Sequence, residues 1–356
     1  MRRYLCIRST RRSSAELQAM RATSTTPPLL QHWPAHAAGQ LSDMMRAHAH
    51  RGAYAVFDAD NTTYHHDLVG ALLPFMEMRG LLTRDTMHAS LQPIPFKDAV
   101  GHRESLHSYY HRLGDIDDQV GYPWASQIFA GFTLRELKIQ IDELLAWGRP
   151  IPAQVYVNDR VEQVLIETPR LQRGQQELYA ALMQHGIEVY VVSAAAEELV
   201  RMVLSDPQYG CHVKPQNVIG VTMLLKDRAT GHVTTARKRI SERCYSPADL
   251  LDHELTPTLW APLPWYEGKP AAIRTYIHAW KKPVLVAGDT PASDGPMFLH
   301  TPDIEQGALR LFVSRKPSYH ESIHQLQHEH AAAQLAHGVP VTADRNWLVV
   351  TPDEIA

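Results

Sequence analysis

The chain is poor in cysteine and has no Cys-x-x-Cys pair. Its 356 residues contain three cysteines, Cys6, Cys211 and Cys244, which are widely spaced. Disulfide frameworks use an even set of cysteines, and thiolate zinc sites use closely spaced pairs. The sequence therefore indicates neither kind of site, and this use of cysteine fits a reducing compartment best.

Long apolar runs are also missing. The most apolar stretches, Val189–Ala196 and Val284–Gly288, are far shorter than the roughly 20 residues that a membrane-spanning helix requires, so we expect no integral membrane segment. The N-terminus has the positive charge of a secretory signal, but Arg8, Arg11 and Arg12 interrupt it before an apolar region forms. We expect the chain as written to be cytoplasmic, or periplasmic if the true start lies upstream and encodes an export signal.

Neither sign of charge is in large excess. The 35 lysines and arginines are scattered along the chain against 38 aspartates and glutamates, so the formal net charge is −3. Nucleic-acid binding needs a basic stripe that exchanges counterions on phosphates, and the absence of such a stripe argues against a nucleic-acid partner. With 44% hydrophobic residues and more than twice the usual length of a single domain, the chain is expected to form a large core and a second unit.

Three short apolar runs predict the central strands of the core. Residues 53–57, 187–192 and 283–287 have the length and composition of buried parallel strands. Helical patterns lie between them, such as Arg173–His185, where apolar side chains recur at helical spacing before a glycine stop. This alternation predicts an α/β fold with a Rossmann-like, doubly wound parallel sheet and helices on both of its faces.

Residues 76–162 interrupt the alternation of strands and helices. They are rich in aromatic residues and helical patterns and contain no obvious core strand, so we expect an inserted, mainly helical cap domain. The core then comprises residues 29–75 and 163–356. Residues 1–28 combine Arg, Ser and Thr with little apolar periodicity, which predicts a mobile N-terminal extension.

Polar residues follow each of the three predicted strands. Because parallel strands end at one edge of a sheet, we expect these side chains to converge there. An isolated Asp-x-Asp is commonly a turn or a helix cap, but several such groups at strand ends indicate a site of chemistry. In chain order the groups are Asp58 with Asp60, Ser193, Lys269, and Asp289 with Asp294.

These groups resemble the four motifs of the haloacid dehalogenase superfamily of phosphatases, in the order in which that superfamily has them. The resemblance covers roughly residues 29–313 and implies that Asp58 is the nucleophile that forms an aspartyl-phosphate. It also implies that Asp60 is the general acid for the leaving group and then the base for the hydrolytic water. Dehalogenating members of the superfamily lack this second acid, so Asp60 favours phosphate chemistry.

The same resemblance implies which residues hold the phosphate and a metal ion. Thr62, Ser193 and Lys269 would bind phosphoryl oxygens, and Lys269 would also balance the charge of the nucleophile. A carboxylate that attacks a phosphate dianion is repelled by it, so we expect a divalent cation with oxygen ligands, by default Mg²⁺. The metal-site residues would be Asp58 and Asp289, Asp60 through its backbone carbonyl, and Asp294, which would orient bound water or Lys269.

The cap is expected to select a small phosphorylated substrate. Short strings in this chain, Asp58–Tyr64, His66-Asp67-Leu68, Tyr109-Tyr110 and Tyr122-Pro-Trp124, resemble bacterial phosphorylcholine phosphatases. That family hydrolyses phosphocholine, and often phosphoethanolamine, to the alcohol and phosphate. Aromatic faces beside carboxylates suit a quaternary ammonium group. The predicted substrate-binding residues are Tyr109, Tyr110, Tyr122 and Trp124, beside the cap acids Glu104, Glu136, Asp142 and Glu143.

Other substrates and other roles stay open at this stage. Phosphoserine or another small phosphomonoester is the rival substrate, and a catalytically inactive binding protein is the alternative outside the enzymes. His320, His324 and His328 recur at four-residue intervals on a predicted helix. We expect a solvated helix face there and no zinc site, because no glutamate joins these residues in a His-Glu-x-x-His arrangement. The sequence does not predict the oligomeric state.

Overall fold

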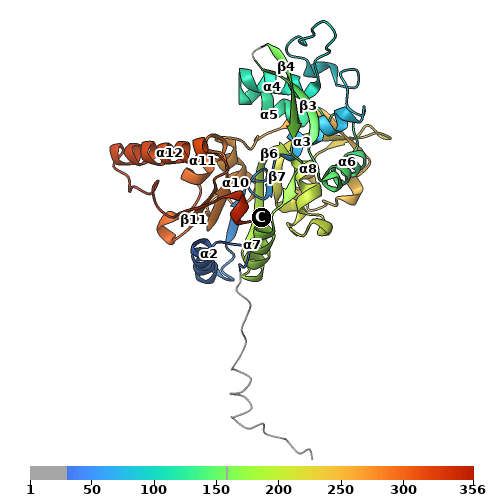
Figure 1. Ribbon diagram of the computed structural model, residues 1–356. Helices are drawn as coiled ribbons and strands as arrows, with labels where there is room; N and C mark the ends of the chain where they lie inside the picture. Colours follow the sequence, from blue (N-terminus) through green and yellow to red (C-terminus); the bar gives the residue numbers. More distant parts are fainter. Residues whose placement is uncertain (1–29, 158) are drawn as a thin grey trace, which may run out of the picture.

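The centre of the molecule is an eight-stranded sheet in the computed structural model, which describes residues 30–157 and 159–356 (Figure 1). The strands run in the order β12 (Trp347–Val350), β11 (Leu309–Val313), β10 (Leu285–Gly288), β1 (Tyr54–Phe57), β6 (Glu188–Ala196), β7 (Val218–Asp227) and β8 (Val233–Thr234), with β9 (His253–Trp260) paired to β7. Neighbours from β12 to β7 are parallel, whereas β8 and β9 lie antiparallel to β7. The predicted mobile extension, residues 1–28, lies outside the described residues.

The three predicted strands lie side by side in the middle of the sheet as β10, β1 and β6. Ala55 in β1 is level with Leu285 in β10 and with Val189 in β6. All four residues of β1 are buried, as the apolar run predicts. The α/β fold class with a central parallel sheet is therefore confirmed, and the residues that follow these three strands share one edge of the sheet.

Helices cover both faces of this sheet. They are α2 (Ala35–His48), α7 (Arg173–Gln184), α8 (Glu197–Leu204), α9 (Ala236–Ser241), α10 (Gly268–Tyr276), α11 (Pro291–His300) and α12 (Pro317–Ala336). Ala55 and Phe57 of β1 pack in one apolar cluster with α2 and α7, whereas Tyr54 and Val56 pack in another with α10, α11 and α12. This alternation is the period of two that a strand imposes, and it makes the sheet doubly wound.

The part of the chain from α3 to β4, which spans the predicted cap, contains four α-helices and a hairpin among its described residues. Its elements are α3 (Leu68–Met78), α4 (Leu106–Ile116), α5 (Asp118–Gln127), α6 (Leu134–Trp147), β3 (Ile151–Val157) and β4 (Arg160–Ile166). Figure 1 shows α4, α5 and the β3–β4 hairpin together at the top of the molecule, away from α2 and α7. Helix α6 is delimited by its own sequence, because Thr133 and Glu136 form a capping box and Gly148 ends the helix at φ 58°.

The β3–β4 hairpin adds two strands to a segment that the sequence predicts to be mainly helical and without core strands. It pairs only with itself, from Ile151 opposite Ile166 to Val157 opposite Arg160. A two-stranded hairpin outside the main sheet leaves much of its surface exposed, so it lacks the continuous apolar run that marks a core strand. The predicted domain boundary at residue 162 falls inside β4.

The 20-residue helix α12 carries the three regularly spaced histidines. Its Ile323 is buried in the apolar cluster on the sheet, whereas His320, His324 and His328 are exposed. The Nε2 atoms of His320 and His324 lie 3.2 Å apart, on a face open to solvent as expected. Among the helices of residues 30–157 and 159–356, none combines the length and the apolar character needed to cross a membrane.

Candidate active site

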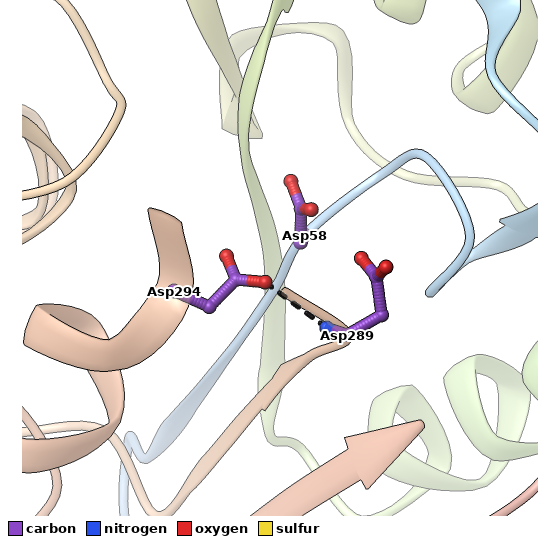
Figure 2. A group of neighbouring side chains, drawn as sticks. All are labelled: Asp58, Asp289 and Asp294. Carbon is purple, nitrogen blue, oxygen red and sulfur yellow. Dashed lines mark hydrogen bonds between the residues drawn. The ribbon is translucent and has the colours of Figure 1, made fainter. Parts of the chain in front are cut away.

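The residues that follow β10, β1 and β6 meet around one cavity of about 120 Å³. Asp58 follows β1, Asp289 follows β10 and Ser193 lies within β6, near its carboxyl end; all three line the cavity. Figure 2 shows Asp58, Asp289 and Asp294 gathered at this edge of the sheet, with one carboxylate oxygen of each within 4.8 Å of the others. The structure therefore brings together groups that lie more than 200 residues apart in the sequence.

The turn after β1 is held by its own backbone. The amides of Thr62, Thr63 and Tyr64 all donate to the carbonyl oxygen of Ala59, at 3.3, 2.8 and 3.3 Å. Asn61 has the left-handed conformation, with φ 57°, which asparagine tolerates better than most residues. The turn leads into β2 (Tyr64–His65), which pairs with β5 (Arg170–Leu171).

The side chains of Asp60 and Thr62, both in this turn, have different surroundings. Asp60 lines the cavity, and its Oδ1 accepts a hydrogen bond from the backbone amide of Leu68 at 2.7 Å. Thr62 is fully buried, and its hydroxyl lies 3.4 Å from Oδ1 of Asp289. Thr62 therefore contacts a cavity residue but does not line the cavity itself.

Lys269, near the start of α10, is fully buried between two carboxylates. Its Nζ lies 2.8 Å from Oδ1 of Asp58 and 2.5 Å from Oδ1 of Asp294. Oδ2 of Asp294 accepts hydrogen bonds from the amides of Asp289 and Thr290, at 3.0 and 2.9 Å, and the first of these is the dashed line in Figure 2. Asp294 thus fixes Lys269 to the loop that carries Asp289.

Two glycines allow these close approaches. A Cβ at Gly288 would lie 2.6 Å from Oδ2 of Asp294, and a Cβ at Gly268 would lie 1.7 Å from the carbonyl oxygen of Leu263. Both distances are too short for a carbon side chain. A larger residue at either position would displace the loop that carries Asp294 or the helix that carries Lys269.

The carboxyls of the cavity have raised pKa values. Burial, and then the neighbouring carboxylates Asp294 and Asp289, raise the pKa of Asp58 to about 7, although Lys269 opposes the shift. Burial and Asp294 raise the pKa of Asp289 to about 6, with Arg315 opposing it. Such shifts show that the two nearby cations do not fully compensate the buried negative charge.

This arrangement has two chemical consequences. Burial, followed by the proximity of Asp67, raises the pKa of Asp60 well above its usual value, so Asp60 can hold the proton that a general acid needs. Asp58, Asp289 and Asp294 offer hard oxygen donors with excess negative charge, a donor set that fits a magnesium ion. The residues present therefore fit both predicted roles, the acid and the metal site.

Two charged residues of the cavity were not anticipated as site residues from the sequence. Arg315 lines the cavity and forms an ion pair with Asp289. It comes two residues after the end of β11, so recognition of Leu309–Val313 as a fourth apolar strand is the signal that could have found it. Asp67 also lines the cavity and is the N-cap of α3, where its position before an apolar helix is the available signal.

The four aromatic residues predicted to bind the substrate divide into two pairs. Tyr110 and Tyr122 line the cavity. Tyr109 and Trp124 are buried and do not line it: the Tyr109 hydroxyl donates to the carbonyl oxygen of Ile94, and Nε1 of Trp124 donates to that of Leu91. Trp124 stacks on Tyr110 at a ring distance of 6.0 Å, so it supports the cavity wall from behind.

The cap acids are placed away from the cavity. Glu104 pairs with Arg112, Glu136 with Arg228 and caps its own helix, Asp142 with Lys138, and Glu143 with Arg79. None of the four lines the cavity. The acid beside the cavity aromatics is instead Asp67, from the core, which comes two residues after the end of β2.

Comparison with known proteins identifies the family. No protein-family model matches the chain. A phosphorylcholine phosphatase from Pseudomonas aeruginosa is 57% identical to it over 326 residues, which cover 92% of this chain and 93% of that protein. The chain belongs to the phosphorylcholine phosphatase family. It is therefore a phosphoric monoester hydrolase, as the motifs at the strand ends predict.

Solved structures resemble the chain more distantly. A conserved, functionally unknown protein from Anaerococcus prevotii aligns with a TM-score of 0.58 and 16% identity, over 85% of this chain and 93% of that one. A had family hydrolase from Salmonella enterica serovar Typhi aligns with a TM-score of 0.38 and 13% identity, over 76% of this chain and 67% of that one. The first likeness supports the fold, and the second is too remote to add to it.

Proposed function

We propose that this member of the phosphorylcholine phosphatase family is a magnesium-dependent phosphomonoesterase that hydrolyses phosphocholine, and also phosphoethanolamine, through an aspartyl-phosphate. The observation that carries the proposal is that Asp58 and Asp60 line the same cavity as Tyr110 and Tyr122. The P. aeruginosa phosphorylcholine phosphatase, at 57% identity over nearly the whole chain, supports the same substrate.

The proposed reaction uses the two acids of the first motif in turn. A carboxylate oxygen of Asp58 attacks phosphorus, the bond from phosphorus to the ester oxygen breaks, and Asp60 gives its proton to the departing choline oxygen. Asp60, now ionised, takes a proton from the water that attacks the aspartyl-phosphate, which releases phosphate and restores both acids. The raised pKa of Asp60 supports its first task, because the acid must be protonated before the leaving group departs.

Other residues of the site hold the reacting groups in place. Lys269, 2.8 Å from Asp58, orients this carboxylate and offsets its charge. The hydroxyl of Ser193 and the side chain of Arg315 line the cavity and are available to phosphoryl oxygens. Thr62 is assigned the same role by its motif, although in the structure it contacts Asp289 and not the cavity.

Asp58, Asp289 and the backbone carbonyl of Asp60 would hold the magnesium ion, with Asp294 orienting the loop of Asp289. When bound, the ion neutralises the negative charge that the substrate dianion and the attacking carboxylate bring together. Asp294 suits the orienting role because both of its oxygens already accept hydrogen bonds, from Lys269 and from two backbone amides.

Magnesium should stabilise the protein more near pH 7 than near pH 5. The pKa values of Asp58, about 7, and Asp289, about 6, lie above the value of 3.8 expected in the unfolded chain, so the folded state holds protons that the unfolded state releases. The free energy of unfolding of the metal-free protein should therefore fall as the pH rises from about 4 to about 7. A bound cation offsets this loss, by about 2.7 kcal/mol when free Mg²⁺ is 100 times its Kd.

The measurement is thermal unfolding with and without Mg²⁺ at the two pH values. Asp289→Asn should remove most of the stabilisation by Mg²⁺, whereas Asp43→Asn, the same change on an exposed acid of α2, should keep it. Equal melting temperatures with and without saturating Mg²⁺ at both pH values would contradict the metal assignment.

The two cavity tyrosines should matter for the cation of the substrate. Each contact between an aromatic face and an ammonium group contributes about 0.5–2 kcal/mol, so Tyr110→Leu or Tyr122→Leu should raise KM for phosphocholine by about 2- to 30-fold. The KM for p-nitrophenyl phosphate, which lacks the ammonium, should change less. Tyr110→Phe keeps the ring and should retain the wild-type KM. Equal losses on both substrates in the leucine variants would mean that the rings only pack the cap.

The overall proposal is tested by measuring phosphate release from phosphocholine, phosphoethanolamine and phosphoserine in the presence of Mg²⁺. We expect the highest kcat/KM with phosphocholine, and none of this activity in Asp58→Asn. Faster hydrolysis of phosphoserine would make an anionic phosphomonoester the substrate. No phosphate release from any phosphomonoester would favour a binding protein.

A further inference from the structure

Asp67 is an acid of the cavity wall without a cation of its own. It lines the cavity with Tyr110 and Tyr122, and it is exposed. Within residues 30–157 and 159–356, no basic side chain forms an ion pair with it. The nearest groups that could offset its charge are Arg315 and His111.

Neither of these two groups is free to neutralise Asp67. Arg315 already forms an ion pair with Asp289, and its guanidinium also lies over the ring of Tyr319. Burial lowers the pKa of His111 below its usual value of 6.5, so this imidazole is neutral near pH 7. Desolvation by the surrounding protein raises the pKa of Asp67, and no close cation reverses this shift.

Helix α3 fixes the orientation of Asp67. One of its oxygens, Oδ1, accepts the amide of Gly70 at 2.5 Å and caps the first turn. This bond uses only part of the hydrogen-bonding capacity of the carboxylate, which leaves Oδ2 available to a ligand. A carboxylate held at the positive end of a helix is also favoured in its ionised form.

The backbone places Asp67 next to the predicted general acid. The amide of Leu68, the residue after Asp67, donates to Oδ1 of Asp60 at 2.7 Å, and the charge of Asp67 is close enough to raise the pKa of Asp60. In phosphocholine only two carbons separate the ester oxygen from the ammonium nitrogen. A counter-ion for that ammonium must therefore lie beside the acid that protonates the ester oxygen, and Asp67 occupies such a position.

The aromatic residues complete the same wall. Tyr110, whose ring stacks on Trp124 at 6.0 Å, lies close enough to Asp67 and Asp60 for burial and these carboxylates together to raise its pKa. Tyr122 packs edge-on against Trp265 at 5.9 Å and stacks on Tyr266 at 6.4 Å, which holds its ring in place. A carboxylate beside two fixed aromatic rings is an arrangement that favours a methylated ammonium.

We propose that Asp67 is the counter-ion of the substrate ammonium and that it sets the preference of the cavity for cationic over neutral and anionic leaving groups. This inference rests on the proposed function. It assigns the selectivity to a residue of the core, two residues after the end of β2, because the four cap acids are all engaged elsewhere. The carboxylate of a leaving group such as that of phosphoserine would be repelled by the same charge.

The test compares phosphocholine with 3,3-dimethylbutyl phosphate, a neutral analogue in which carbon replaces the ammonium nitrogen. In the wild type we expect a higher kcat/KM for phosphocholine. Asp67→Asn keeps the helix cap, because asparagine caps as well as aspartate, but removes the charge. It should reduce the ratio of the two kcat/KM values about 10- to 100-fold, mainly through phosphocholine, and should raise kcat/KM for phosphoserine.

The matched control is Asp118→Asn. Asp118 accepts a hydrogen bond from the hydroxyl of Tyr266, whose ring stacks on that of Tyr122, and it does not line the cavity. This variant also removes one negative charge near the aromatic wall, yet it should keep the wild-type ratio. A similar fall in both variants would show a general effect of charge and overturn the assignment to Asp67.

Failure of this inference can be distinguished from failure of the proposed function. If the wild type prefers phosphocholine to its neutral analogue and Asp67→Asn keeps that preference, only the role of Asp67 is overturned. Equal losses on both substrates in Asp67→Asn and in Asp67→Ser, which also caps helices, would show a structural role of the cap and overturn it too. If the wild type does not hydrolyse phosphocholine at all, the proposed function itself is wrong.

Discussion

Asp58→Asn should abolish the hydrolysis of every phosphomonoester while the protein stays folded. The amide has almost the same shape as the carboxylate but cannot attack phosphorus, so kcat should fall by at least about four powers of ten, as expected for the loss of a covalent nucleophile. Lys269 would keep its ion pair with Asp294, at 2.5 Å, which preserves the local structure. The measurements are phosphate release and thermal unfolding.

The matched control is Asp43→Asn, which makes the same chemical change on an exposed residue and should leave kcat unchanged. Substantial activity in a well-folded Asp58→Asn protein would show that Asp58 is not the nucleophile.

Asp60→Asn separates the two steps of the mechanism. The p-nitrophenolate group leaves without a proton, so this variant should still transfer the phosphoryl group from p-nitrophenyl phosphate to Asp58. The following hydrolysis, which needs the base, should slow by about two to four powers of ten. Mass spectrometry of the acid-quenched variant should then show the added mass of one phosphoryl group, and Asp58→Asn should show none.

The middle of the fold could be predicted because buried parallel strands are apolar on both faces. The runs at residues 53–57, 187–192 and 283–287 became β1, β6 and β10, which are neighbours in the sheet. Strands that lie at the periphery leave no such signal. In β9 and in the β3–β4 hairpin buried and exposed residues are mixed, so their sequences resemble loops or amphipathic segments.

The acids of the site could be predicted from the sequence for a similar reason. Asp58 and Asp289 each follow an apolar strand directly, so the residue type and its position both point to the sheet edge. Arg315 and Asp67 carry the same kinds of charge, but they follow a strand that was not recognised and a two-residue strand that no pattern marks. Their place in the site depends on tertiary structure that short motifs do not contain.

The cap aromatics show that residues close together in the sequence cannot be assigned to the cavity as one group. Successive residues on a helix point about 100° apart, so Tyr109 and Tyr110 of α4 cannot both face the cavity. Tyr122 and Trp124 of α5 are two residues apart, or about 200°, and point to nearly opposite sides. One residue of each pair therefore lines the cavity and the other packs behind it. The short sequence strings do not show which residue of a pair takes which place.

Lys269→Met should cost the metal-free protein the most stability of the changes considered, in addition to its activity. Lys269 is fully buried, and its Nζ contacts Asp58 at 2.8 Å and Asp294 at 2.5 Å. Methionine fills a similar volume but leaves two enclosed carboxylates without their common cation. Removal of one partner from a buried ion pair typically costs about 3–5 kcal/mol, and we expect a loss in that range near pH 7.

The pH dependence tests the cause of this loss. The pKa of Asp58 is about 7 with Lys269 present, and it should rise further without it. Near pH 5 Asp58 is protonated in the wild type as well as in the variant, so its charge no longer contributes to the difference and the loss of stability should be smaller. Lys214→Met is the matched control: it removes the exposed lysine that pairs with Glu188 on the surface, and should cost no more than about 1 kcal/mol. Denaturant unfolding of the three proteins at both pH values measures these differences. Equal stability of Lys269→Met and wild type near pH 7 would mean that the buried carboxylates do not need Lys269 as their counter-ion.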